Sequence, residues 1–214
     1  MLTPLDYAQS ACDTLMRKYA ASDLPPKGHF HYHQGVFLSG MYQTYQLCGN
    51  EAYFQYMKDW IDSVFDEKGN IRECTFADLD DIQPGILLFP LLEKTGDPYY
   101  LRCLKSVHEE VRAIARNSEG GYWHKTHLTD QMWLDGLYMA GPFCAEYARR
   151  FTLPALRKTI IQQALMMEKN TLDPKPACSI TPGTAPAVPL GLTRKQDARR
   201  SSGGAPSAGY RWRC

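Results

Sequence analysis

The sequence has no long hydrophobic run, no closely paired cysteines and no strong excess of charge. No apolar stretch approaches the roughly 18 residues that cross a membrane, and the mean hydropathy is −0.40. The N-terminal segment from Met1 to Asp6 has neither a basic nor a long apolar region, so we expect no secretory signal. Seven cysteines without a Cys-x-x-Cys pair indicate free thiols in a reducing compartment. These absences predict a cytoplasmic protein without a membrane partner.

The net charge of +1 conceals an uneven distribution. Residues 174–214, which we call the basic tail, hold seven Lys or Arg and one acidic residue, whereas residues 1–173 have a balance of −5. The mildly acidic body carries no basic footprint, so we expect no nucleic-acid partner. Phosphate-binding loops, nucleophile elbows and Cys–His pairs are also missing.

What the sequence does contain is a repeat of helical hairpins. After a first expected helix over 4–20, three glycines, Gly35, Gly85 and Gly136, lie 50 and 51 residues apart. Each opens an apolar helix that is followed by an amphipathic one, and such periods are typical of stacked supersecondary units. The expected pairs are 36–48 with 50–65, 86–95 with 97–116, and 137–150 with a helix to about 169. Alternating inner and outer helices predict an all-α toroid, of which three hairpins form about half.

A polar cluster precedes each expected inner helix, at 29–34, 78–83 and 129–135. Equivalent positions in a ring of hairpins lie at one mouth, where the N-termini of inner helices favour anions. Aspartates, histidines, amides and aromatic rings at one rim suit a sugar acid. Carboxylates can transfer protons, aromatic faces can stack on the ring and amides can bind hydroxyls. Each cluster taken singly is also explained as a solvated loop.

Asp135 is the one carboxylate within the apolar stretch 133–143. An unpaired carboxylate in such surroundings is costly, so we expect a raised pKa or a partner, and a protonated carboxyl group serves general acid catalysis. The alternative is that Asp135 only caps the helix that begins at Gly136.

The six histidines give a weaker signal. His29, His31 and His33 alternate, as ligands on a strand can, but no cysteine or carboxylate pair at ligand spacing accompanies them. We therefore expect no metal and no cofactor. His124 and His127 flank the third cluster, where either side chain can pack or face the rim.

Four segments together resemble a known family of enzymes. They are His31–Val36, Leu79–Gly85, His124–Lys125 and, above all, Gln131–Phe143. They are similar to the unsaturated rhamnogalacturonyl hydrolases of glycoside hydrolase family 105, and the resemblance covers residues 1 to about 175. It implies a six-hairpin (α/α)6 barrel, in line with the repeat. It also implies hydration of the C4–C5 double bond of a terminal unsaturated galacturonyl residue, without a metal. Water adds at C5, and the hemiketal collapses to release the rhamnose-bearing partner.

The resemblance assigns roles to individual residues. Asp135 matches the family's general acid/base and Asp80 matches a second aspartate of its site. With the polar clusters, this gives catalytic residues Asp135 and Asp80. The expected substrate-binding residues are Tyr32, His33, Gln34, His124, Gln131 and Trp133.

The basic tail has a different texture from the body. Its six Pro, five Gly and six Ala show no helical periodicity, a composition typical of disorder. A shifted reading frame is the stronger interpretation, because residues 200–214 can be back-translated in another frame to PEFWGRAIGWVPVAL, which resembles the family's next active-site segment. Reinserting one adenine at the Lys175 codon would restore that frame.

The sequence thus predicts two regions, a partial barrel over 1–173 and an irregular tail over 174–214. The expected substrate is an unsaturated galacturonyl–rhamnose disaccharide from pectin, and we expect this shortened form to be impaired. The alternatives are an unsaturated glucuronyl hydrolase, and a non-enzymatic helical-repeat module whose apolar inner face binds a partner. The sequence leaves the oligomeric state open.

Overall fold

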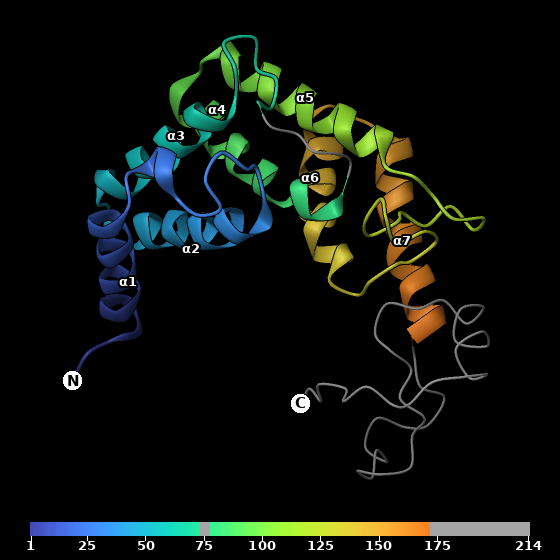
Figure 1. Cartoon of the computed structure of the whole chain (residues 1–214), viewed down its shortest axis with the longest axis horizontal. Helices are drawn as coiled ribbons and strands as arrows, with labels where there is room; N and C mark the ends of the chain where they lie inside the picture. The colour runs from blue at the N-terminus through green and yellow to red at the C-terminus, as the bar shows by residue number, and fades with distance from the viewer. Residues whose placement is uncertain (73–77, 172–214) are drawn as a thin grey trace.

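The chain forms an arch of helices that alternate between an inner and an outer layer (Figure 1). The computed structural model describes residues 1–72 and 78–171. Within these residues all regular secondary structure is helical, apart from two isolated bridges, Phe65 to Ile71 and Arg116 to Tyr122. The expected all-α fold is confirmed. The expectations for the basic tail lie outside the described residues.

Seven α-helices and three short 3₁₀ segments follow one another in the described part of the chain. The α-helices are α1 Pro4–Lys18, α2 Tyr32–Cys48, α3 Glu51–Val64, α4 Leu88–Thr95, α5 Pro98–Ala113, α6 Gly136–Arg150 and α7 Pro154–Thr171. The 3₁₀ segments are η1 Ala21–Asp23, η2 Leu79–Asp81 and η3 Gln83–Leu87. The three expected hairpins are therefore α2 with α3, η3–α4 with α5, and α6 with α7.

Capping chemistry explains where the helices of a hairpin separate. Gly49 and Gly96 end α2 and α4 in the left-handed conformation, with φ of 71° and 66°. Asn50 and Asp97 then accept a backbone N–H of the next helix. The third hairpin has no glycine at this point, and Thr152 takes a positive φ of 52° instead.

Large apolar side chains fill the space between the two layers. The most deeply buried include Trp60, Tyr53, Tyr100, Phe65, Phe143, Leu38, Met57, Ile61 and Leu88. Five of these nine come from the amphipathic outer helices α3 and α5, whose apolar faces pack on the inner layer. The inner segments also contact one another, α2 against η3 and η3 against α6.

Some apolar side chains remain uncovered within the described residues, as the half-ring prediction implies. On the inner helices these are Val36 and Leu47 of α2 and Tyr138 of α6, and on α7 they are Ile161 and Leu165. No helix of residues 1–72 and 78–171 is long and apolar enough to span a membrane.

The repeated glycines do not all open helices, and this corrects two expected boundaries. Gly136 is the first residue of α6, but Gly35 lies inside α2 and Gly85 inside η3. At all three glycines a neighbouring segment approaches the backbone closely. A Cβ atom at Gly35 would lie 2.0 Å from Gln83 Oε1, one at Gly85 would lie 2.7 Å from Phe143, and one at Gly136 would lie 2.9 Å from Leu79. The period therefore marks where neighbouring inner segments touch.

We expect Gly35→Ala to destabilise the fold by about 2–3 kcal/mol, because the added methyl group meets the Pro84 backbone as well as the Gln83 side chain. Gly40→Ala is the matched control on the same helix, since no atom lies within 4 Å of its added Cβ. It should stabilise α2 by about 0.5–1 kcal/mol. Urea unfolding of the two variants measures the difference, and equal stabilities would contradict the packing role of Gly35.

Candidate active site

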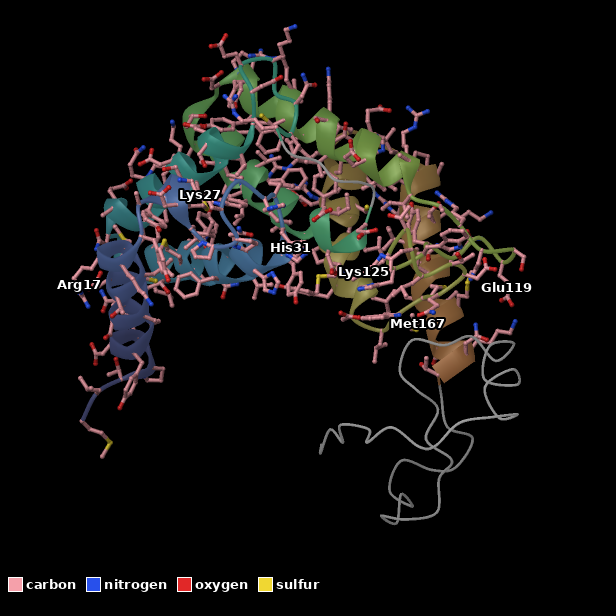
Figure 2. All side chains as sticks on the ribbon, in the orientation of Figure 1. Arg17, Lys27, His31, Glu119, Lys125 and Met167 are labelled. Atoms are coloured by element: carbon pink, nitrogen blue, oxygen red, sulfur yellow. The ribbon has the colours of Figure 1, made fainter. Side chains whose placement is uncertain are left out.

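The candidate site lies where the three polar clusters meet, and Asp80 is at its centre. Asp80 belongs to η2 and is only 4% exposed. Its Oδ2 accepts a 2.6 Å hydrogen bond from Lys125 Nζ and lies 3.9 Å from His31 Nε2, while its Oδ1 lies 3.3 Å from His124 Nε2. Figure 2 shows His31 and Lys125 near each other at the middle of the arch.

The charge state of Asp80 follows from these neighbours. Burial works to raise its pKa, but the imidazole of His124 and the ammonium of Lys125 outweigh burial and lower the pKa to about 2. The same pairing, together with nearby carboxylates, raises the pKa of Lys125 although its partial burial opposes this. Asp80 is therefore an ionised carboxylate throughout the neutral range.

His124 is held on the loop between α5 and α6 and is 1% exposed. Its backbone N–H donates to Gln131 O at 2.7 Å, and its ring stacks on Trp133 with 4.4 Å between centroids and 8° between planes. Its Nδ1 has no hydrogen-bond partner among the described residues, and the same is true of Asp80 Oδ1. Both atoms are enclosed by the protein, with His124 Nδ1 facing Gly136 and Asp80 Oδ1 facing His124 Nε2.

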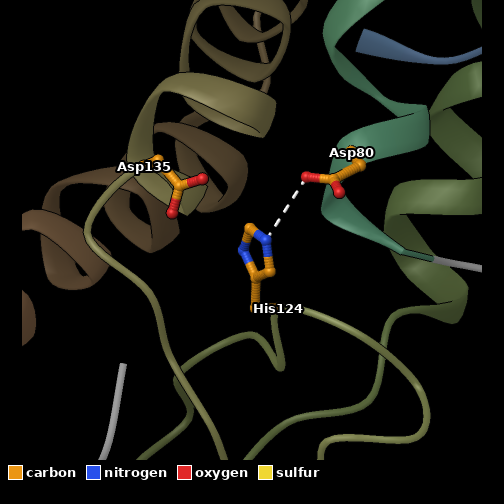
Figure 3. A group of neighbouring side chains, drawn as sticks. All are labelled: Asp80, His124 and Asp135. Atoms are coloured by element: carbon orange, nitrogen blue, oxygen red, sulfur yellow. Dashed lines mark ion pairs between the residues drawn. The ribbon is translucent and has the colours of Figure 1, made fainter. Parts of the chain in front are cut away.

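Asp135 completes the group, as Figure 3 shows. Asp80, His124 and Asp135 each offer an oxygen or nitrogen atom within 4.8 Å of the others. They come from three segments, η2, the α5–α6 loop and the residue that precedes α6. The prediction that the two aspartates share one end of the helical array is confirmed.

The structure places Asp135 differently from what its apolar neighbours indicate, and it gives Asp135 no capping role. Its side chain is exposed rather than buried among the apolar residues around it, because a helical turn directs Met139 and Phe143 into the core and leaves Leu134 and Asp135 outside. It also makes no capping hydrogen bond. A capping residue needs an extended backbone, whereas Asp135 has helical angles of −66° and −21°.

The expected substrate-binding residues fall into two groups. Trp133 lies at the site through its stack on His124, and Gln131 accepts a hydrogen bond from Trp133 Nε1 at 3.2 Å. His31, Tyr32 and His33 form a stack of rings with centroids 4.2–4.7 Å apart at the start of α2.

Gln34 occupies a different position from these rings. It is 1% exposed, and its amide donates to Pro26 O at 2.6 Å and to Leu24 O at 3.4 Å. The described contacts of Gln34 therefore hold the 24–26 segment against α2.

Sequence reasoning missed two residues that contact Asp80, namely Lys125 and His31. Lys125 follows His124 directly within a motif that was recognised, so its position was the available signal. For His31 the signal was weaker, because only the fold brings the N-terminus of α2 to η2. His127, the other histidine that flanks the third cluster, is exposed.

The three donor atoms of Asp80, His124 and Asp135 also test the expectation that no metal binds. A cation held by Asp80 would lie beside the Lys125 ammonium, which already occupies Asp80 Oδ2. Like charges repel strongly at such a distance when buried. The Lys125 ammonium therefore disfavours a cation at Asp80 Oδ2.

Asp81 has the opposite electrostatic setting from Asp80. Burial, followed by the neighbouring carboxylates of Asp78 and Asp80, raises the pKa of Asp81 to about 7. Between the ordinary pKa of 3.8 and about 7 the folded state binds more protons than the unfolded state, so ionisation of Asp81 costs stability as the pH rises.

We expect Asp81→Asn to stabilise the chain at pH 8 by roughly 1–3 kcal/mol, with the gain disappearing near pH 4. Urea unfolding of the parent chain and of Asp81→Asn at pH 4, 6 and 8 measures this gain in stability. A gain that does not depend on pH would show that lost charge at Asp81 is not its source.

Comparison with known proteins places the chain in a family. The family model described as Glycosyl Hydrolase Family 88 matches residues 7–177. The unsaturated rhamnogalacturonyl hydrolase YesR of Bacillus subtilis (strain 168) is 28% identical over 121 residues, which cover 54% of this chain and 34% of that protein.

Solved structures agree with the sequence match. A glycoside hydrolase from family 105 of C. acetobutylicum ATCC 824 is similar with a TM-score of 0.71 and 27% identity, covering 79% of this chain and 46% of the other. A possible family 105 member from Klebsiella pneumoniae gives a TM-score of 0.60 and 27% identity, covering 68% and 38%.

The chain thus spans about a third of the length of the curated relative and less than half of these two solved structures. The matched region nevertheless contains every residue of the candidate site. With a family model that covers most of its length, the chain belongs to glycosyl hydrolase family 88.

Proposed function

We propose that this chain carries the acid/base centre of a hydrolase for unsaturated galacturonyl–rhamnose disaccharides. The observation that supports this most directly is the pairing of an exposed carboxylate, Asp135, with a buried ionised one, Asp80, within 4.8 Å of His124. The lowered pKa of Asp80 suits a permanent charge, and the resemblance to family 105 assigns proton transfer to Asp135. The similarity to YesR, whose name states this substrate class, favours the same disaccharide.

In the proposed reaction Asp135 donates a proton to C4 of the unsaturated ring. The electron pair of the C4–C5 double bond forms the new C–H bond, and positive charge develops at C5 and the ring oxygen. Water then adds at C5 and gives a proton to the Asp135 carboxylate, which restores the donor and leaves a hemiketal. The hemiketal opens and the partner sugar leaves as an alcohol. The overall reaction consumes one molecule of water.

The remaining residues have supporting roles in this proposal. The negative charge of Asp80 stabilises the positive charge that develops in the ring. The Lys125 ammonium, whose side chain is 25% exposed, can pair with the uronate carboxylate, and the ring of Trp133 presents a stacking face. A small, mostly apolar pocket, lined in part by Leu79, Trp133 and Leu137, borders the site.

The test compares unsaturated galacturonyl–rhamnose with an unsaturated glucuronyl disaccharide, following the loss of the double-bond absorbance. Because the chain spans less than half of its solved relatives, turnover is measured on the form with the restored frame, and the 214-residue form serves as the comparison. We expect a higher kcat/KM for the rhamnose disaccharide and impaired turnover by the short form. A preference for the glucuronyl substrate would assign the chain to the alternative specificity.

A non-enzymatic role has one observation in its favour, the uncovered Val36, Leu47 and Tyr138 on the inner helices. Such a module would bind a protein at this face and show no affinity for uronates. Equilibrium binding of the disaccharide to the 214-residue chain distinguishes the two functions.

A further inference from the structure

The turn at 78–80 contacts the loop at 124–126 through three successive interactions. Leu79 N donates to His124 O at 3.1 Å, Asp80 accepts from Lys125 Nζ, and Asp78 Oδ1 accepts from both the backbone N–H and the hydroxyl of Thr126, at 2.6 and 2.7 Å. The two segments are 48 residues apart in the sequence at Asp78 and Thr126. Along the loop, Lys125 is therefore flanked by His124 and Thr126, and the backbone of each makes a hydrogen bond to the 78–80 turn.

We propose that Asp78 is a positioning residue: by holding Thr126 it fixes the register in which Lys125 and His124 meet Asp80. Asp78 touches none of the atoms that the proposed reaction changes. Its consequence for substrate binding rests on the proposed function, because the Lys125 ammonium is there the partner of the uronate carboxylate.

The loop needs such a tie because it has little regular structure. Between the end of α5 at Ala113 and the start of α6 at Gly136 the described chain contains no helix. On the N-terminal side of Lys125, the backbone is fixed by the hydrogen bonds of His124 to Gln131 and Leu79. On its C-terminal side the carbonyl of Lys125 accepts a local hydrogen bond from Leu128 N at 3.0 Å. The contact of Thr126 with Asp78 is the tie that reaches across to the aspartate turn.

The chemistry of the contact suits this role. One carboxylate oxygen receives an amide N–H and a hydroxyl at 2.6 and 2.7 Å, and hydrogen bonds to carboxylates are about twice as strong as those between neutral groups. An asparagine at position 78 keeps an acceptor oxygen, whereas alanine removes both interactions. A valine at position 126 keeps the shape and the amide but loses the hydroxyl. Comparing these substitutions distinguishes the loss of the Asp78–Thr126 hydrogen bonds from a general effect of side-chain volume.

The experiment measures how fast Lys125 reacts with an amine-acylating reagent near pH 8 in the 214-residue chain. Mass spectrometry gives the ratio of its rate to that of Lys105, an exposed lysine on α5. In the parent chain Lys125 should react slowly, because its ammonium is held by the Asp80 carboxylate at 2.6 Å. We expect Asp78→Ala to raise the ratio about five-fold and Thr126→Val about two-fold, with Asp78→Asn and Thr126→Ser near the parent value.

An unchanged ratio in Asp78→Ala, in a chain that keeps its helical circular dichroism, would overturn the proposal, even if its melting temperature falls. If Asp78→Ala does not fold, the comparison of Thr126→Val with Thr126→Ser decides, and equal ratios for those two overturn it. The ratio of the Lys125 and Lys105 reaction rates is measured without substrate. It is therefore informative even if the parent chain binds no uronate and the proposed function fails. Where the parent form turns over substrate, Asp78→Ala should raise KM more than it lowers kcat.

Discussion

Asp135→Asn is expected to reduce turnover of the unsaturated galacturonyl–rhamnose disaccharide by at least about 10²-fold, the usual scale for a positioned proton donor. Asparagine keeps the size and the backbone preference of the residue but has no proton to give at this step. Because Asp135 makes no capping hydrogen bond and is exposed, the stability of the protein should change by less than about 0.5 kcal/mol.

The control for Asp135 is the same substitution at Asp130 of the preceding loop. Asp130 is exposed, accepts a hydrogen bond from Trp123 Nε1 at 3.1 Å and has a positive φ of 63°, which asparagine tolerates well. Asp130→Asn should keep turnover within a few-fold of the parent. Near-normal rates in Asp135→Asn, or equal losses in both variants, would remove Asp135 from the acid/base role.

Asp80→Asn should cost about 2 kcal/mol of stability at pH 7, with a large loss of turnover as well. The pKa of Asp80 is lowered to about 2 from 3.8, so its charge stabilises the fold above about pH 4, and this contribution is lost as the pH falls through about 2. The neutral amide cannot match the charge of Lys125, which keeps its ammonium but loses its buried partner.

Urea unfolding at pH 7, 5 and 3 tests the Asp80 prediction, because the gap between parent and variant should narrow toward acid pH. Asp59→Asn on α3 is the control, since Asp59 is exposed and accepts only from Gln55 among the described residues. It should change stability by less than about 0.5 kcal/mol. If the unfolding free energies of the parent and Asp80→Asn differ by the same amount at every pH, the loss of stability comes from packing and not from the charge of Asp80.

The hairpin architecture was predictable because its signals are local. Glycine followed by Asn50 or Asp97 ends one helix and caps the next within a few residues, and the 50-residue spacing repeats this pattern. The shared mouth followed from the same repeat, and the convergence of Asp80 and Asp135 confirms it. Sequence alone could not say why Gly35 is a glycine, since its neighbour Gln83 lies on another segment.

The details of the site depended on contacts between distant segments. The burial of Asp80 and the exposure of Asp135 reverse what their flanking residues indicate, because Asp80 is enclosed by Lys125 and His124 from a loop about 45 residues away. The start of α2 at Tyr32 likewise reflects an extended His31 at its N-cap rather than any capping side chain. Such features arise from the tertiary structure and leave no periodic trace in the sequence.

The most direct test of the proposed chemistry is a nuclear magnetic resonance time course of the disaccharide with the frame-restored protein. Hydration predicts that the vinylic proton at C4 disappears in step with the release of rhamnose, because protonation at C4 is part of the cleavage. Asp135→Asn should slow both signals equally. Release of rhamnose together with an unsaturated uronate that still carries the vinylic proton would contradict the account, since it would place the cleavage at the anomeric carbon.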